Sequence, residues 1–335
     1  MKTVVITRLG GPEVLQLVDR EMPNPGPGEV LVRVLATGVA YADVLMRTGL
    51  YLGVPKLPYP PGYDVVGVVG GAGSGVSRVK AGDTVAALTV TGGYSQYVAL
   101  AESELVAVPP GVDPAEAVCL VLNYTTAYQM LHRVGKVQKG SRVLIHGAAG
   151  GVGTAVLELG RIAGLEMWGT ASPGKHDLIR SFGGTPINYK SEDFVAVVRK
   201  TTGDGVDLAL DPVGWSHFWR SFRALRKGGK LIGYGVSAAM NHRASKLIGL
   251  GSFAILGMLP MTSLSRSAEW FNVTSFKKKH GNWFREDLAV LMQLLADKKI
   301  RQVVAERFPL RDAAKAHRLL DSAAVTGKIV LLPQA

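Results

Sequence analysis

The stretch that decides the fold is Ser141-Arg-Val-Leu-Ile-His-Gly-Ala-Ala-Gly-Gly-Val-Gly153. Its apolar run over 143–145 has the length and composition of a buried β-strand. The glycines that follow lead into Thr154-Ala-Val-Leu-Glu-Leu-Gly-Arg-Ile-Ala163, which has helical spacing. A strand, a glycine turn and a helix in this order predict the first half of a dinucleotide-binding unit.

The glycines of this turn have physical roles that an ordinary tight turn would not need. Gly147 and Gly150 let backbone N–H groups approach a pyrophosphate without Cβ atoms in the way, and Gly153 lets the helix lie close to the strand. The helix N-terminus adds unpaired N–H donors and a positive dipole end. We therefore expect the cofactor to contact Ala149, Gly150, Gly151, Val152 and Gly153.

Composition limits the classes of protein that fit. A chain of 335 residues with 47% apolar and 19% charged residues suits two globular domains. No apolar run reaches the roughly 18 residues of a membrane helix, and Met1-Lys-Thr-Val-Val-Ile is too short for a signal peptide. The single cysteine, Cys119, excludes an internal disulfide and a cysteine-rich zinc site. We expect a cytoplasmic protein without a membrane span.

The net charge of +12 allows a nucleic-acid or anionic-lipid partner, or simply a solvated surface and a phosphate-bearing cofactor. Lys277-Lys278-Lys279 is the only basic run, and no RNA-binding motif accompanies it. We expect no specific nucleic-acid partner.

The pattern of predicted secondary structure changes near Pro114. Before it, short β-forming runs alternate with Gly- and Pro-rich turns, which predicts a small β-barrel. After it, strands alternate with helices, which predicts a doubly wound parallel sheet in an α/β domain. We expect the final strand, Lys328-Ile-Val-Leu-Leu332, to return to the first domain.

Several motifs together resemble the medium-chain dehydrogenase/reductase superfamily, in its quinone oxidoreductase branch. They are Gly49-Leu-Tyr51, Pro61-Gly-Tyr-Asp64, Ala148-Ala-Gly-Gly-Val-Gly153, Ala209-Leu-Asp-Pro-Val-Gly214 and Gly327-Lys-Ile-Val330, and residues 276–288 also resemble VAT-like members. The resemblance implies a GroES-like β-barrel domain from residues 1–122 and 283–335. It also implies a Rossmann domain over 123–282 and an active-site cleft between the two. In relatives, an edge strand corresponding to residues 250–262 pairs across a two-fold axis, so we expect a homodimer.

Alcohol dehydrogenases of this superfamily hold a catalytic zinc, and their ligand positions correspond here to Ala40 and Tyr63. Neither residue is the expected ligand, so we expect no metal site. Without a Lewis acid an unactivated alcohol is a poor substrate, whereas a quinone or an α,β-unsaturated carbonyl spreads the charge that a hydride brings. The resemblance places Tyr51 on the substrate side, although it also fits a half-buried barrel tyrosine. Tyr41 and Asp43 lie in a segment that lines the cleft in relatives. Asp43 fits a proton relay and a structural hydrogen-bond acceptor equally well.

The second strand of the nucleotide domain distinguishes the two nicotinamide cofactors. NAD-selective domains place an acid at its end to bind the ribose 2′-OH, but here it ends Trp168-Gly-Thr-Ala-Ser172. Ser172 and Lys175 supply a hydroxyl and a positive charge suited to a 2′-phosphate, so we expect NADPH. The resemblance adds Tyr189 to that pocket and places Thr126, Gly235 and Val236 near the nicotinamide. Thr126 is also compatible with a helix-capping role.

Two functions follow. The first is a zinc-independent NADPH-dependent reductase that transfers a hydride to a small-molecule quinone or enone. The second is a nucleotide-binding protein with little catalysis, as in crystallin-like and vesicle-associated relatives.

Overall fold

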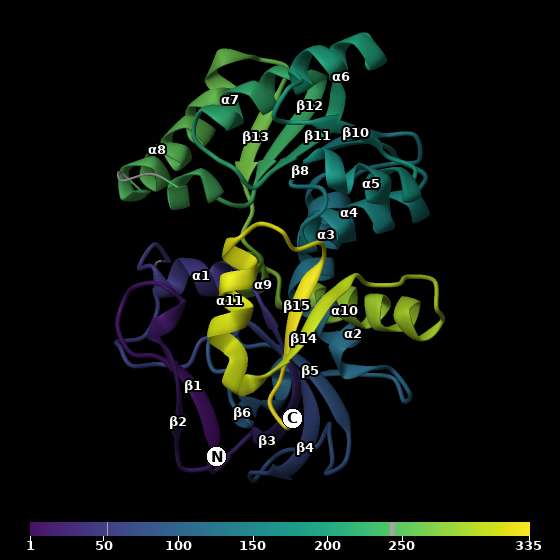
Figure 1. The fold of residues 1–335 in the computed structure, drawn as a ribbon. Helices are drawn as coiled ribbons and strands as arrows, with labels where there is room; N and C mark the ends of the chain where they lie inside the picture. Colours follow the sequence, from purple (N-terminus) through teal and green to yellow (C-terminus); the bar gives the residue numbers. More distant parts are fainter. Residues whose placement is uncertain (52, 242–244) are drawn as a thin grey trace. The chain divides into compact units, whose positions relative to one another are not determined.

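The computed structural model describes residues 1–51, 53–241 and 245–335. It forms two compact units (Figure 1): unit 1 comprises Met1–Thr125 and Lys277–Ala335, and unit 2 comprises Thr126–Phe276. Among the described residues, no helix has both the length and the apolar character needed to cross a membrane.

Unit 2 is built on one parallel sheet, whose order over the described residues is β10-β9-β8-β11-β12-β13. This is the strand order of a doubly wound dinucleotide-binding fold, so the predicted Rossmann domain is confirmed. The strands are β8 (Arg142–His146), β9 (Glu166–Ala171), β10 (Thr185–Asn188), β11 (Val206–Asp211), β12 (Leu225–Gly233) and β13 (Ser267–Trp270). The helices are α4 (Gly151–Ile162), α5 (His176–Ser181), α6 (Phe194–Thr202), α7 (Ser216–Arg223) and α8 (Ser245–Met258), and the boundaries of the unit fall within α3 (Thr125–Tyr128) and α9 (Val273–Lys279).

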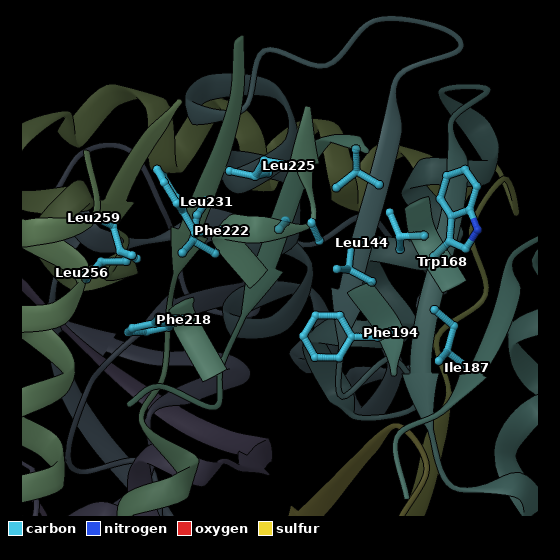
Figure 2. Packing of buried hydrophobic residues seen from close by; sticks show 14 residues of the cluster. Leu144, Trp168, Ile187, Phe194, Phe218, Phe222, Leu225, Leu231, Leu256 and Leu259 are labelled. Carbon is cyan, nitrogen blue, oxygen red and sulfur yellow. The ribbon is translucent and has the colours of Figure 1, made fainter. Parts of the chain in front are cut away.

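The two faces of this sheet are covered by different helices. From β8 the chain proceeds outward in one direction through β9 to β10, and later in the other direction from β11 to β13. Right-handed crossovers in opposite directions place their helices on opposite faces. One face carries a core that joins strand residues such as Leu144 and Leu231 to Phe194 of α6, Phe218 of α7 and Leu256 of α8 (Figure 2). Helix α4 packs against β8 and β9.

The prediction of an edge strand at residues 250–262 is wrong. Most of this segment lies in α8, and the edge strand is β13. Within 250–262 only Ile255 and Thr262 are β-branched, so the run lacks the stiff side chains that favour a strand. Its buried residues Ser252, Leu256 and Leu259 follow helical spacing.

Unit 1 is built mainly from antiparallel strands. The hairpin β1–β2 forms a separate small sheet, and over the described residues the larger sheet has the order β14-β15-β3-β4-β5-β7, with β6 also paired to β3. The strands are β1 (Lys2–Ile6), β2 (Leu15–Asp19), β3 (Glu29–Val39), β4 (Asp64–Ala72), β5 (Thr84–Leu88), β6 (Tyr97–Ala101), β7 (Val106–Ala107), β14 (Val304–Pro309) and β15 (Lys328–Leu332). The helices are α1 (Tyr41–Arg47), α2 (Pro114–Cys119), α10 (Gly281–Ala296) and α11 (Ala313–Asp321).

Strand β3 organises unit 1. One edge of β3 pairs with β4, and the other pairs with β6 over its first half and β15 over its second half. Alternate residues Val30, Val32 and Val34 enter the core with side chains of β4, β5 and β6, as expected for a strand with one buried face. The pairing of β15 with β3 confirms that the last strand returns to the first domain.

A buried ion pair fixes this return. The Lys328 ammonium lies 2.5 Å from the Asp64 carboxylate, and their side chains are 2% and 0% exposed. The second oxygen of Asp64 accepts a hydrogen bond from the Gly38 N–H at 2.8 Å. A Cβ on Gly38 would lie 1.8 Å from Lys328 Cε, so only glycine leaves room for the lysine to cross β3.

We expect Lys328→Met to lower the free energy of unfolding by about 3–5 kcal/mol, because it leaves the Asp64 carboxylate buried without its cation. Lys2→Met is the matched control, since it breaks an exposed pair with Asp19 and should cost less than about 1 kcal/mol. Urea unfolding measures both. Equal losses in the two variants would contradict this role of the buried pair.

Candidate functional site

The glycine turn of unit 2 connects β8 to α4 and has the geometry of a phosphate cradle. Gly147 adopts a φ of +65°, which a residue with a side chain rarely adopts. Gly150 is the N-cap of α4 and provides no side-chain cap. A Cβ on Gly153 would lie 2.3 Å from the Gly147 carbonyl oxygen, so this position requires glycine.

The start of α4 is therefore suited to an anion. Helix geometry leaves its first N–H groups without acceptors inside the helix, and the macrodipole adds positive potential there. The predicted residues lie together at this point: Ala149 and Gly153 are buried, and Gly150, Gly151 and Val152 are half-buried. They fit the pyrophosphate of a dinucleotide.

The carboxyl ends of β9 and β10 place Ser172 and Tyr189 next to each other in the sheet. Ala171 pairs with Asn188 at the end of the two strands, so Ser172 and Tyr189, the next residues, follow neighbouring strands at the same level. The Lys175 N–H donates to the Ser172 carbonyl oxygen at 2.9 Å, which brings the lysine back toward this end. Lys175 is half-buried, and burial lowers the pKa of its ammonium group. Ser172 and Tyr189 are half-buried and exposed, respectively.

Gly235 and Val236 follow β12 and are held by the loop after β11. A Cβ on Gly235 would lie 2.7 Å from the Pro212 carbonyl oxygen, so the two loops meet through a glycine. The Ser237 N–H donates to that same oxygen at 2.9 Å. Thr126 is buried in α3, a helix that precedes β8 in the chain, so it does not belong to any of these strand ends. Its predicted place near the nicotinamide stays a prediction.

Sequence reasoning missed a polar cluster at the same edge of the sheet. One imidazole nitrogen each of His146 and His217 and one carboxylate oxygen of Asp211 lie within 4.8 Å of one another. Ser221 and Thr170 form hydrogen bonds with His146. Because His146 and His217 are 71 positions apart (217 − 146), no local motif joins them. The available signal was that His146 and Asp211 each directly follow an apolar run, over 143–145 and 208–210, at the end of a strand.

The cluster has the residue types of a transition-metal site, but hydrogen bonds engage both nitrogens of His146, Nδ1 of His217 and the Asp211 carboxylate. His146 contacts Thr170 through Nδ1 and Ser221 through Nε2, at 3.0 and 3.1 Å. His217 Nδ1 lies 2.7 Å from Asp211 Oδ2. Burial lowers the pKa of His146 to about 3. Burial would raise the pKa of Asp211, but the hydrogen bond and charge of His217, with further help from His146 and Ser221, lower it to about 2.

In unit 1, Asp43 is a fully buried acceptor at the start of α1. Its carboxylate accepts hydrogen bonds from the Ala40 N–H at 2.8 Å and the Gly62 N–H at 3.0 Å. Burial raises its pKa to about 7 despite these bonds. Tyr94 adds a longer contact to Asp43 and lies 3.0 Å from His317 Nε2. Asp43 thus joins α1 to the Gly62 segment, which is the geometry of a structural acceptor.

Tyr51 and Tyr63 form a pair. Their hydroxyl oxygens are 2.7 Å apart, and the rings meet edge to face with centroids 6.2 Å apart. Tyr63 is 2% exposed, whereas Tyr51 is half-buried and presents part of its surface to solvent. Tyr41 is 41% exposed at the first position of α1. Partial burial, and secondarily the charge of Asp321, raises the pKa of the Tyr41 phenol.

Comparisons with known proteins agree with this architecture. Residues 26–110 match the family model of the alcohol dehydrogenase GroES-like domain, and residues 184–331 match that of zinc-binding dehydrogenases. The chain is 32% identical over 342 residues to the synaptic vesicle membrane protein VAT-1 homolog of Rattus norvegicus, covering 99% of this chain and 84% of that protein. It is 29% identical over 338 residues to the quinone oxidoreductase of Homo sapiens, covering 99% and 98%.

Among solved structures, the Escherichia coli quinone oxidoreductase complexed with NADPH is similar with a TM-score of 0.89 and 28% identity, covering 99% of this chain and 100% of that one. Full-length similarity at this level, together with the GroES-like match and the parallel sheet, identifies the family. The chain belongs to the medium-chain dehydrogenase/reductase superfamily, in the branch that contains quinone oxidoreductases and VAT-1 homologues.

Proposed function

We propose that this protein is an NADPH-dependent oxidoreductase that reduces quinones or α,β-unsaturated carbonyl compounds without a metal ion. The observation that carries the proposal is the end of β9, where Ser172 directly follows the strand, Lys175 stands three residues later and no acid lies between them. An acid there would bind a ribose 2′-OH and repel a 2′-phosphate. Relatives named quinone oxidoreductase, one of them solved with NADPH, support the same cofactor and acceptor class.

NADPH, when bound, supplies the hydride. In the proposal, the start of α4 holds its pyrophosphate, Ser172, Lys175 and Tyr189 hold the 2′-phosphate, and Gly235, Val236 and Thr126 lie beside the nicotinamide. These residues bind and orient the cofactor, which lowers the entropic part of the barrier to transfer.

The acceptor class follows from the residues that stand at the family's zinc-ligand positions. The Ala40 side chain is a methyl group without a lone pair, and the Tyr63 hydroxyl is engaged with Tyr51. A conjugated acceptor needs less help than an alcohol, because it delocalises the incoming charge itself. Tyr51 has a partly exposed ring and a hydroxyl that Tyr63 orients, so we assign it the hydrogen bond to the acceptor oxygen. Tyr41 is a second contact to the acceptor, from a partly exposed position. Asp43 supports the segment around Tyr41 through its buried hydrogen bonds with the Ala40 and Gly62 N–H groups.

We expect the purified protein to oxidise NADPH in the presence of quinones or enones, and to leave saturated ketones unreacted. The assay contains a metal chelator, because the proposed chemistry uses no metal ion. NADPH absorbance, read across a panel of matched conjugated and saturated acceptors, measures the rate. Tight NADPH binding with no turnover of any acceptor would favour a binding protein, and activity that the chelator abolishes and Zn²⁺ restores would contradict the metal-free mechanism.

Lys175→Ala should weaken NADPH binding about 10- to 100-fold, because a charge-assisted hydrogen bond contributes roughly 1.5–3 kcal/mol. NADH binding should stay nearly unchanged, since NADH lacks the 2′-phosphate. Lys200→Ala is the matched control, as it removes an equal charge from an exposed position at the end of α6. Fluorescence titration of wild type and the two variants with NADPH and NADH gives the six dissociation constants. Equal losses for both cofactors would show that Lys175 does not contact the 2′-phosphate.

A further inference from the structure

Five side chains form a continuous hydrogen-bonded chain across the carboxyl edge of the parallel sheet. We name it the edge relay, and its members are Thr170 of β9, His146 of β8, Asp211 of β11, and His217 and Ser221 of α7. His217 is partly exposed, and the other four members are buried. The relay therefore crosses three neighbouring strands at the edge where doubly wound folds bind their ligands.

The protons of the relay can be assigned in one direction. Asp211 is an acceptor only, so the Ser221 hydroxyl, 2.5 Å away, donates to it. Ser221 has then used its proton, and its oxygen accepts from His146 Nε2–H. His146 is neutral, so its Nδ1 accepts from the Thr170 hydroxyl. His217 Nδ1–H donates to Asp211 from the other side, and every donor in the chain points toward this carboxylate.

Asp211 also fixes the backbone of the loop that follows β11. Its Oδ1 accepts hydrogen bonds from the N–H groups of Val213 and Gly214 at 2.7 and 3.3 Å. The carbonyl oxygens of Pro212 and Val213 in turn accept from Ser237 and Ala238 at 2.9 Å each. The loop after β11 is thereby fixed by the carboxylate, and it fixes the loop after β12 that contains Gly235 and Val236.

The other end of the relay reaches the glycine turn. His146 directly precedes Gly147, and the Ala148 N–H donates to the Thr170 carbonyl oxygen at 3.1 Å. Thr170 also stands two residues before Ser172. Three segments proposed above for NADPH therefore depend on the same set of hydrogen bonds: the glycine turn, the end of β9 and the loop after β12.

We propose that His217 and Ser221 are positioning residues for the cofactor, which act through Asp211 and His146 on these three segments. This inference rests on the proposed function, because NADPH is the ligand whose site they arrange. His217 is the better residue to substitute, since its partial exposure lets the fold tolerate a change. Its donor is also replaceable, because the Asn side-chain N–H can occupy the place of imidazole Nδ1–H.

The test compares wild type with His217→Ala, His217→Asn and the control His280→Ala, a histidine of unit 1. We expect His217→Ala to raise the Kd and the KM for NADPH about tenfold, since a charge-assisted hydrogen bond is lost. The kcat at saturating NADPH and the KM for the acceptor should stay unchanged. His217→Asn should restore the NADPH values to within about twofold, because it keeps the donor. Ser221→Ala should act in the same direction as His217→Ala.

Hydrogen exchange of the cofactor-free protein provides a second measurement that is independent of NADPH. The amides of Val213 and Gly214 should lose protection in His217→Ala and keep it in His217→Asn. If wild type does not bind NADPH, the proposed function fails, and the exchange data alone still decide whether the relay orders these loops.

Three results would overturn the inference. The first is unchanged NADPH affinity and amide protection in His217→Ala. The second is an equal loss in the Ala and Asn variants, which would assign the effect to ring packing on Phe194 instead of the donor. The third is stoichiometric binding of Zn²⁺ that His217→Ala abolishes, because a metal ion would use the lone pairs that the relay engages.

Discussion

The close approach of α4 to the end of β8 is the constraint on which the nucleotide-binding unit depends. With glycine at position 153, the first turn of the helix rests directly on residues 147–148, where a Cβ would lie 2.7 Å from the Ala148 Cα. This contact sets the direction of α4 and hence of its free N–H groups. The same turn leaves no side chain to cap them. A negatively charged ligand is the natural complement of such a helix end.

The other segments at the carboxyl edge of the sheet are held together by the buried carboxylate of Asp211. Asp211 is an ionised group without solvent, and the donors arranged around it offset the cost of its burial. Because these donors come from different strands and loops, the carboxylate acts as a shared anchor for segments that are distant in sequence. Unit 1 uses the same principle, since the Asp64 carboxylate joins β4, the Gly38 N–H and the Lys328 ammonium. In each unit a buried carboxylate thus connects segments that the chain itself separates.

Local patterns predicted the local elements well. Strand β8 and the start of α4 follow from an apolar run and glycines, and β15 covers Lys328–Leu332 as expected. The prediction for residues 250–262 failed because an apolar run does not by itself distinguish a strand from a buried helix, although its few β-branched residues favour the helix. The helical period of its buried residues becomes visible only once the neighbouring elements are placed. Helix α11 and strand β14 were not predicted, because short amphipathic segments carry weak signals.

The candidate site was predictable where a backbone motif or a missing acid carries the information, as in the glycine turn and the end of β9. Side-chain constellations were not, because they depend on which strand ends become neighbours. His146 and His217 meet only through the sheet order, and Tyr51 meets Tyr63 only through the folding of a Pro-rich loop. Asp43 illustrates the same limit, since its sequence context did not show that it would be fully buried.

A crystal structure of the protein with NADPH tests the central claim most directly. We expect the pyrophosphate at the N–H groups of residues 151–153, and the 2′-phosphate within hydrogen-bonding distance of Lys175 Nζ and Ser172 Oγ. A 2′-phosphate that points into solvent away from both side chains, or a pyrophosphate bound elsewhere than the start of α4, would contradict it.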